Sequence, residues 1–375
     1  MPANNRCNVG FIGCGQLMTG QHIQNTHHSK INRIHTLCDI DEPKMLAVAK
    51  QYPPLKTTTD YKQLLADPQV QLVVIAMNPE RHAALAIEAL RAGKDVYVEK
   101  PMGVSVAEAR DIARTAIECN RRVTTGFNRR FAPAYMDIKP YLQQRQGGLT
   151  VFYRIADLER WQRHDSPRLL HEIVHIFDIL SYFIESEPVG IYVNQGWHPN
   201  DNLLTLNYAD KSVATILSTG RTGCIPKERV ELHWDMSAIE VESFVEARYY
   251  HVSKAPLVKR FAGRISDKAG SLSKLAADDG METLRELLRE STQLYDDALA
   301  GKITKRDVEE RSRGYIEEKG WAQALDEMGL SILENRKPTN ATPTDGIRSI
   351  VLAEAAYESL KTCQAVTLNP SAWQV

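Results

Sequence analysis

The sequence predicts an α/β protein: a doubly wound parallel sheet (Rossmann domain) followed by an α+β part with a mostly antiparallel sheet. Three observations predict it: an apolar run ending in a glycine turn, strand and helix patterns that alternate up to residue 126, and a later succession of short strands. At 375 residues the chain is too long for one ordinary core. We therefore expect two domains, 1–126 and 127–375.

The composition is that of a soluble globular protein, with 43% hydrophobic and 25% charged residues. The 46 basic and 47 acidic side chains give a formal charge of −1, so no general attraction to nucleic acid or anionic membranes is expected. The chain shows no apolar signal region and no run long enough to span a bilayer. Its 6 cysteines are scattered, without a C-x-x-C pair. We expect a cytoplasmic protein with reduced thiols.

The first strand and its glycines have the arrangement of a dinucleotide site. A strand at 8–13 ends in Gly13-Cys14-Gly15, a helical pattern follows, and a second strand at 34–38 ends at Asp39. Glycines let the backbone approach a pyrophosphate, and the start of the helix supplies N–H groups. Asp39 stands where an acid binds the adenosine ribose hydroxyls and repels a 2′-phosphate. The pattern therefore favours NAD over NADP.

The alternation then continues along the chain. Strands are expected at 71–76, 95–98 and 122–125, and helices at 79–92 and 105–118, with Ser105 as N-cap and Glu108 completing a capping box. Ligands of such sheets bind at the carboxyl ends of the strands. The predicted cofactor cluster is Gly13, Gly15, Gln16, Leu17, Asp39, Met77, Asn78, Pro79, Glu99 and Lys100. Lys100 is held between an acid and Pro101, where a cis peptide bond is allowed.

The segment 169–180 carries the most concentrated set of ionisable groups. Read as an α-helix, it places His171, His175 and Asp178 on one face, with Glu172 bordering it. His171-Glu172-x-x-His175 matches the H-E-x-x-H pattern of zinc hydrolases. The same residues could handle protons beside a cofactor. The extended zinc pattern requires glycine and histidine at positions that hold Asp178 and Ser181, so no metal is expected.

Several of these residues together resemble a known family, the glucose–fructose oxidoreductase, inositol dehydrogenase and rhizopine-catabolism (Gfo/Idh/MocA) family. The matching positions are Gly13-Cys14-Gly15, Asp39, His82, Glu99-Lys100-Pro101, the segment 126–131 (Gly-Phe-Asn-Arg-Arg-Phe), His175, Asp178 and the segment 353–359. The resemblance implies an NAD(P)-dependent oxidoreductase acting on secondary alcohols of sugars, sugar derivatives or cyclic polyols. It also implies catalytic positions for Lys100 and His175, and cofactor positions for His82 and for Asn128 near the nicotinamide.

The sequence departs from that family at three places. Before the helix at 169–180, Asp165-Ser166-Pro167-Arg168 replaces a glycine-rich run that the family often carries. His171 stands where the inositol dehydrogenase branch carries aspartate, whereas other members carry a glutamate at the position of Glu172. Met77-Asn78-Pro79 replaces the usual Thr-Pro-Asn. These departures bear on the proton relay and the substrate more than on the fold.

The second part begins with a helix at 131–146. Strands are expected at 149–156, 189–195, 202–208, 212–218, 229–234 and 239–247. One face of their sheet should cover the cofactor crevice, and the other should support a homodimer or homotetramer. Residues 255–337 resemble charged amphipathic helices, which either cover the sheet or form an insertion over the substrate site. A loop at 338–344 precedes the closing helix.

Our hypothesis from these patterns is hydride transfer between a carbinol carbon and NAD. His175 would act as general base, Lys100 would hold the reacting oxygen, and Glu172 would orient the imidazole or pass the proton on. Candidates for substrate contact are Arg129, Trp161, Arg163, His171 and Asp178. Two alternatives stay open: a glycosidase or epimerase that oxidises its substrate transiently, and, less favoured, a zinc hydrolase.

Overall fold

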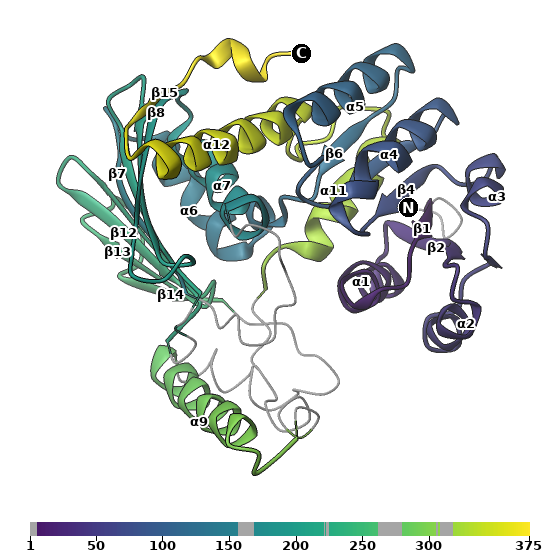
Figure 1. Ribbon diagram of the computed structural model, residues 1–375, viewed down its shortest axis with the longest axis horizontal. Coiled ribbons are helices and arrows are strands. Elements are labelled where there is room, and N and C mark those ends of the chain that lie inside the picture. Colours follow the sequence, from purple (N-terminus) through teal and green to yellow (C-terminus); the bar gives the residue numbers. More distant parts are fainter. Residues whose placement is uncertain are drawn as a thin grey trace.

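The computed structural model describes residues 6–156, 169–220, 222, 225–261, 280–304, 307 and 318–375. Within these ranges the chain forms two sheets, with helices packed between and around them (Figure 1). Trp161, Arg163 and much of the predicted helical segment 255–337 lie outside the described residues.

The first sheet has six parallel strands in the order β3-β2-β1-β4-β5-β6. The strands are β1 (Cys7–Ile12), β2 (Asn32–Cys38), β3 (Lys56–Thr58), β4 (Leu72–Ile75), β5 (Asp95–Val98) and β6 (Val123–Thr125). The four residues of β4 are all buried, as expected for a parallel strand covered on both faces. The strand order reverses between β1 and β4, which opens a crevice at their carboxyl ends. The predicted fold class is confirmed.

The helices of this first unit are the π-helix η1 (Met18–Ile23), α1 (Gln24–His28), α2 (Glu42–Gln51), α3 (Tyr61–Ala66), the 3-10 turn η2 (Pro79–Arg81), α4 (His82–Arg91) and α5 (Val106–Glu118). The helices predicted after Gly15, at 79–92 and at 105–118 are present, and α2 and α3 were not predicted. Ser105 caps α5 by accepting a bond from the backbone N–H of Glu108. The Glu108 carboxylate accepts from Val104 N, at 2.8 Å, and not from Ser105 N. The predicted capping box is therefore half correct.

The second sheet has nine strands in the order β14-β13-β12-β11-β7-β10-β9-β8-β15. The strands are β7 (Thr150–Ala156), β8 (Pro188–Gln195), β9 (Asn202–Tyr208), β10 (Val213–Thr219), β11 (Glu228–Trp234), β12 (Ser237–Glu242), β13 (Glu246–Tyr250), β14 (Val258–Arg260) and β15 (Val366–Thr367). All pairs are antiparallel except β10 with β7. The single strand predicted at 239–247 is wrong. Ser243 and Phe244 adopt left-handed backbone angles there, with φ of 48° and 60°, and turn the chain into the β12–β13 hairpin.

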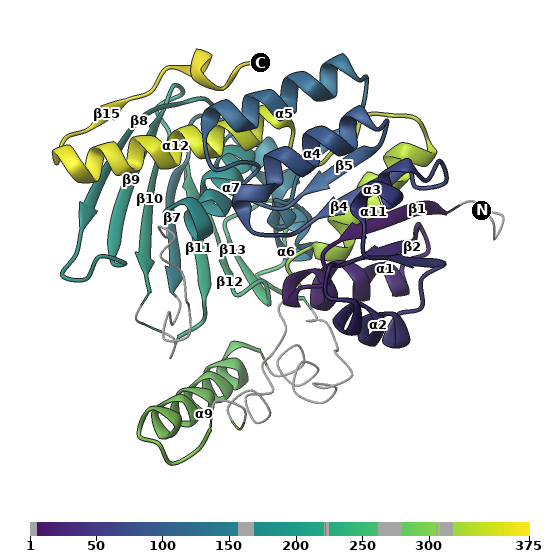
Figure 2. The ribbon, with the colours of Figure 1, turned by 45° about the vertical axis from the view of Figure 1, so that its right-hand side comes forward.

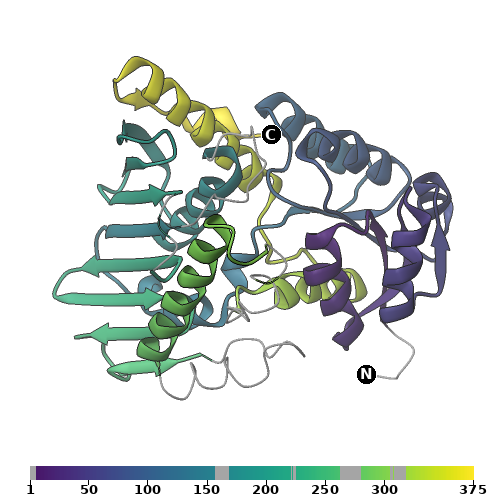
Figure 3. The same cartoon turned by 60° about the horizontal axis from the view of Figure 1, so that its bottom comes forward.

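Three helices cover one face of this second sheet, on the side toward the first unit (Figures 1 and 3). They are α6 (Pro133–Gln143), α7 (Val174–Ile184) and α12 (Pro343–Thr362). Figure 2 shows α12 lying across β8, β9 and β10 and reaching α5 of the first unit. Its start carries a complete capping box between Thr342 and Asp345. Assembly through the opposite face of the sheet stays a prediction.

The chain returns to the first sheet after the second one is complete. Helix α11 (Trp321–Leu333) places Leu325 and Met328 in the core formed by β1 and β2. The buried Asn32 side chain donates to the Leu325 carbonyl oxygen at 3.0 Å. One described part of the predicted helical segment therefore belongs to the first unit, whereas α9 (Met281–Leu299) lies at the bottom of the view (Figure 1). The predicted domain boundary at 126/127 stays a prediction.

Candidate functional site

The glycine turn after β1 leaves open space at the carboxyl edge of the first sheet. Gly13 has a φ of +95°, which an L side chain rarely adopts. Nothing lies within 4 Å of the position that a Cβ on Gly15 would take. The neighbouring Cys14 N–H donates to the Asp39 carboxylate at 2.6 Å, so this turn and the end of β2 are joined. This open turn suits the close approach of a pyrophosphate.

Asp39 is held as a carboxylate at the end of β2. Burial raises its pKa, but bonds from the backbone N–H groups of Asp41 and Cys14, and the nearby Lys44 ammonium, lower the pKa overall. The Lys44 Nζ lies 3.5 Å from Oδ2. A charged acid at this place fits the diol of a ribose and disfavours a 2′-phosphate. The open turn at Gly15 and the ionised Asp39 both fit the predicted dinucleotide.

Met77 and His82 shape the neighbouring edge of the crevice. The His82 ring is buried, with Nδ1 2.7 Å from the Pro101 carbonyl oxygen and Nε2 3.1 Å from the Met77 carbonyl oxygen. Burial lowers the pKa of His82, and its bonds to the two carbonyl oxygens oppose the shift. His82 thus ties the turn after β4 to the turn after β5. Asn78 and Pro79 start the η2 turn beside it.

Glu99 is the buried support of the segment after β5. It lies 2.9 Å from Nε2 of the fully buried His22 and accepts from the backbone N–H of Lys100 at 3.2 Å. A Cβ on Gly126 would lie 2.6 Å from Glu99 Oε1, so only glycine fits beside this carboxylate. The Lys100–Pro101 peptide bond is cis.

The Lys100 side chain reaches from the first unit to the helix that precedes α7. Its ammonium donates to the His171 carbonyl oxygen at 2.7 Å. Burial lowers the pKa of Lys100, while Glu172 and Glu99 oppose the shift. Lys100 therefore stands between the predicted cofactor crevice and the His-Glu segment, where the sequence placed it.

The segment Leu169–Ile173 is a π-helix (η5) and only the residues from Val174 onward are α-helical, so the predicted α-helix is wrong before Val174, whereas the shared face of His171, His175 and Asp178 stays a prediction. Asp178 forms two bonds with the Arg130 guanidinium, at 2.9 and 2.5 Å. Burial raises the pKa of Asp178 to about 6 although Arg130 lowers it.

His175 is a buried imidazole surrounded by cations. Its side chain is 4% exposed, no described residue hydrogen-bonds its Nδ1, and its ring packs edge-on against Phe127. Burial, followed by the charges of Arg129 and Lys100, holds the pKa of His175 well below 6.5. The ring is therefore neutral at physiological pH. A neutral imidazole can accept a proton, as a general base must.

Glu172 supplies the negative charge beside that imidazole. Burial raises the pKa of Glu172, but the positive charges of Lys227, Lys100 and Arg129 lower it by more. The net pKa of Glu172 therefore lies well below 4.5. Its Oε2 lies 3.5 Å from the Lys227 Nζ. The site thus combines an ionised carboxylate with a neutral imidazole.

Three further charged residues belong to this site and were missed in the sequence: Lys227, Glu228 and Lys319. Glu228 binds the Arg129 guanidinium through two bonds of 2.8 and 2.7 Å. It also lies 3.5 Å from the Lys319 Nζ. Lys227 and Glu228 come just before the predicted strand 229–234, and no motif marks them. Arg129 is buried in this pair, and its predicted contact with substrate stays a prediction.

Asn128 connects the site to the returning chain. Its Nδ2 donates to the Lys319 carbonyl oxygen at 2.8 Å, while no described residue bonds its buried Oδ1. The predicted position of Asn128 near the nicotinamide stays a prediction. Among the described residues, no group of three or more His, Cys, Asp or Glu side chains could hold a metal ion.

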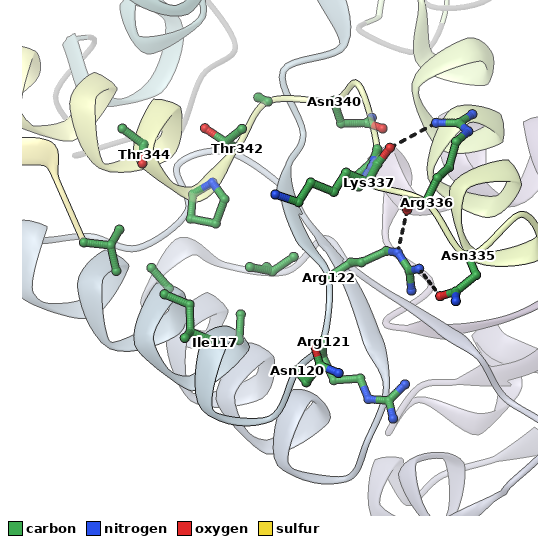
Figure 4. Close-up of a pocket in the computed structure, with 17 residues that line it drawn as sticks. Ile117, Asn120, Arg121, Arg122, Asn335, Arg336, Lys337, Asn340, Thr342 and Thr344 are labelled. Carbon is green, nitrogen blue, oxygen red and sulfur yellow. Dashed lines mark hydrogen bonds between the residues drawn. The ribbon is translucent and has the colours of Figure 1, made fainter.

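A cavity of about 720 Å³ lies elsewhere, between the end of α5 and the loop before α12 (Figure 4). Arg121, Arg122, Arg336 and Lys337 are among its lining residues. Arg122 donates to the Arg336 carbonyl oxygen at 2.9 Å, and Arg336 pairs with Glu327 at 2.6 Å. These arginines hold α11 to the edge of the first sheet. The cavity is lined by neither Lys100 nor His175, so it is separate from that site.

Comparisons with known proteins also indicate an NAD-binding oxidoreductase. Residues 7–127 match the family model GFO_IDH_MocA, described as an oxidoreductase family with an NAD-binding Rossmann fold. An inositol 2-dehydrogenase of Rubrobacter xylanophilus is 26% identical over 376 residues, covering 95% of this chain and 92% of that protein. An uncharacterized oxidoreductase, YrbE of Bacillus subtilis, is 25% identical over 241 residues, or 62% of this chain and 70% of that protein.

Solved structures share the fold of the whole chain. An oxidoreductase domain protein from Kribbella flavida superposes with a TM-score of 0.73 at 17% identity, covering 97% of this chain and 100% of that chain. A myo-inositol dehydrogenase from Lactobacillus casei, in complex with NAD(H) and myo-inositol, gives 0.71 at 16% identity, covering 98% and 100%. In the described part of the chain, no helix is both long and apolar enough to cross a bilayer.

Proposed function

The chain belongs to the Gfo/Idh/MocA family of oxidoreductases, and on that premise we propose that it oxidises a secondary alcohol of a sugar, sugar derivative or cyclic polyol with NAD. The inositol dehydrogenases among its relatives support a polyol-like substrate. The open turn at Gly15 supports a dinucleotide, and the ionised Asp39 supports NAD over NADP.

The observation that carries this proposal is the state of His175. A buried imidazole that is neutral at physiological pH and whose Nδ1 has no partner leaves a ring nitrogen available to a proton from the substrate. Bound NAD⁺ supplies the hydride acceptor. As the carbinol C–H bond breaks, the hydroxyl proton passes to His175 and a carbonyl forms on the substrate.

Lys100 and Glu172 each stabilise a different charge that develops during this reaction. The Lys100 ammonium, held by the His171 carbonyl, stabilises the developing negative charge on the substrate oxygen. The ionised Glu172 stabilises the imidazolium that forms when His175 takes the proton. General base catalysis by a positioned side chain contributes about 10²–10⁴-fold in rate.

A panel of sugars and polyols, offered with NAD⁺ and with NADP⁺, tests the proposal through the near-ultraviolet absorbance of the reduced cofactor. With the best substrate, we expect His175→Ala to lower kcat by about 10²–10⁴-fold. The matched control is His28→Ala, because His28 is exposed on α1. Equal turnover by His175→Ala and the wild type would remove His175 from the mechanism. Product that forms without accumulation of NADH would favour an internal redox cycle.

A further inference from the structure

The buried His22 has no role in the chemistry described so far. It lies on η1, the helix that follows the glycine turn, and its side chain is fully buried. Its Nε2 lies 2.9 Å from Oε1 of Glu99, the residue directly before Lys100. We propose that His22 is a positioning residue for Lys100 and that it acts through the Glu99 carboxylate. This inference rests on the proposed function and adds a residue to it.

The Glu99 carboxylate joins His22 to the backbone of Lys100. Its Oε1 contacts the imidazole, and its Oε2 accepts from the backbone N–H of Lys100 at 3.2 Å. A carboxylate oxygen accepts hydrogen bonds, so Nε2 of His22 is the donor in this contact. The carboxylate has little room to move, because a Cβ on Gly126 would lie 2.6 Å from Oε1 and 3.0 Å from Oε2. Each carboxylate oxygen therefore has a fixed partner.

Neighbouring rings fix the orientation of the His22 imidazole. Tyr97 of β5 packs edge-on against it, with 5.4 Å between the ring centroids, and Trp321 of α11 does the same at 5.5 Å. The His22 carbonyl oxygen accepts from the Thr26 hydroxyl at 2.8 Å. Three elements, η1, β5 and α11, thus place one N–H group against one carboxylate. A donor held in this way binds Glu99 without first having to be ordered.

Lys100 depends on this support because it connects two parts of the molecule. Its backbone follows β5 of the first sheet, whereas its ammonium donates to the His171 carbonyl oxygen on η5 at 2.7 Å. Without His22, the buried Glu99 carboxylate would lose a donor, and would either turn away from the Lys100 N–H or take up a proton. A displacement of about 1 Å at a reacting group can cost about 10²-fold in rate.

Glu99 also supports the positive charge of the Lys100 ammonium. Burial lowers the pKa of Lys100, and the negative charges of Glu172 and Glu99 oppose that shift. Loss of the His22 donor favours the protonated form of Glu99, since a buried carboxylate depends on its donors. The pKa of Lys100 should then fall further, so that its ammonium deprotonates at a lower pH. The charged groups that act on Lys100 are Glu172, Glu99, Arg129 and Lys227.

His22→Leu and His22→Gln test the role of the bond between His22 and Glu99. Leucine removes the donor, whereas glutamine keeps a side-chain N–H that can reach the carboxylate. With the best substrate of the panel, we expect His22→Leu to lower kcat by about tenfold or more and to leave the NADH dissociation constant within about twofold of the wild type. His22→Gln should recover most of the kcat. The matched control is His28→Leu, because His28 is exposed on α1, and it should keep the wild-type kcat.

A second measurement follows the Lys100 ammonium without turnover. Competitive labelling with acetic anhydride, followed by mass spectrometry of the peptide that contains Lys100, gives the pH at which Lys100 deprotonates. We expect that pH to be lower in His22→Leu than in the wild type, and close to the wild type in His22→Gln. A role of His22 in packing alone would not move this titration. If His22→Leu fails to fold, His22→Phe replaces it, since phenylalanine keeps an aromatic ring and also lacks the donor.

Three results would overturn the inference. One is an unchanged kcat and an unchanged Lys100 titration in a folded variant without the donor. Another is an equal loss in His22→Gln and His22→Leu. The third is a loss of NADH affinity as large as the loss of kcat, because His22 would then act on the cofactor. If the wild type reduces NAD⁺ with none of the sugars or polyols, the proposed dehydrogenase is rejected, whereas the labelling of Lys100 still tests His22.

Discussion

Replacing Glu228 by glutamine should be the most destabilising conservative change in the site. The Glu228 carboxylate accepts two bonds from Arg129 and one from the Tyr153 hydroxyl, and it is almost fully buried. Glutamine has nearly the same shape but no charge, so the substitution leaves a buried guanidinium without its counterion. The NH₂ group of the glutamine would also face a hydrogen-bond donor, either the Arg129 guanidinium or the Tyr153 hydroxyl.

Two routes give the same magnitude for this loss. Burial raises the pKa of Glu228, but the charges of Arg129 and Lys319 lower it by more. The net effect is a fall from the ordinary value of 4.5 to about 2. At about 1.4 kcal/mol per pH unit, that difference corresponds to roughly 3 kcal/mol of folding free energy. Removing one partner of a buried ion pair costs about 3–5 kcal/mol. We therefore expect Glu228→Gln to cost about 3 kcal/mol.

The sign of this contribution fixes its pH dependence. The pKa of Glu228 is lower in the folded protein than in the unfolded chain, so the stabilisation is complete above the unfolded pKa of about 4.5. It is lost as the pH falls from there toward 2. The stability difference between wild type and Glu228→Gln should shrink over the same range.

Thermal unfolding followed by circular dichroism at neutral pH measures the effect. A loss of about 3 kcal/mol corresponds to a Tm lower by roughly 4 °C for a chain of this size. The matched control is Glu231→Gln on the same strand, whose pair with Arg229 is partly exposed and worth at most about 1 kcal/mol. Equal Tm values for the two variants would refute the assigned role of the Arg129–Glu228 pair.

Three further predictions concern the cofactor and the base. Gly15→Ala should leave the Tm of the cofactor-free protein unchanged, since the added Cβ meets nothing within 4 Å. The same substitution should weaken NADH binding by about tenfold or more in a fluorescence titration. Undiminished NADH binding would contradict a pyrophosphate at this turn. Asp39→Ser should lower the preference for NAD⁺ over NADP⁺ by about tenfold or more in kcat/KM, because it removes the ionised carboxylate that repels a 2′-phosphate; an unchanged ratio would reject that role. The pH profile of kcat/KM should have its His175 limb below pH 6.5, and Lys227→Gln should move that limb to higher pH, because Lys227 lowers the His175 pKa. A wild-type limb at or above 6.5, or no movement in the variant, would argue against His175 as the base.

The parts of the fold that depend on residues close together in the sequence were predictable. The glycine turn at Gly13 and the acid at Asp39 belong to one strand–helix–strand unit, so their spacing alone brought them together. Strand β5 was predicted to the residue, because its buried apolar run is short and well bounded. The meander of the second sheet followed from turn residues between apolar strands.

Other features depend on contacts that sequence patterns do not record. The π-helix at Leu169–Ile173 looks like part of an α-helix in sequence, so the α-helix was predicted to begin before Val174. The β12–β13 turn uses Ser243 and Phe244 in left-handed conformations, where a glycine or asparagine would have marked it. Lys319 reaches the site only because α11 folds back onto the first sheet. Tertiary packing decides each of these.

The most direct test of the proposed chemistry follows the hydrogen itself. A substrate identified by the panel, deuterated at the carbinol carbon, is incubated with NAD⁺ and enzyme, and the reduced cofactor is analysed by mass spectrometry. Hydride transfer at the Lys100 and His175 site predicts deuterium in the NADH formed by the wild type. It also predicts a rate lower by about 10²–10⁴-fold in His175→Ala. Product formed without deuterium in the cofactor would contradict the proposed dehydrogenase.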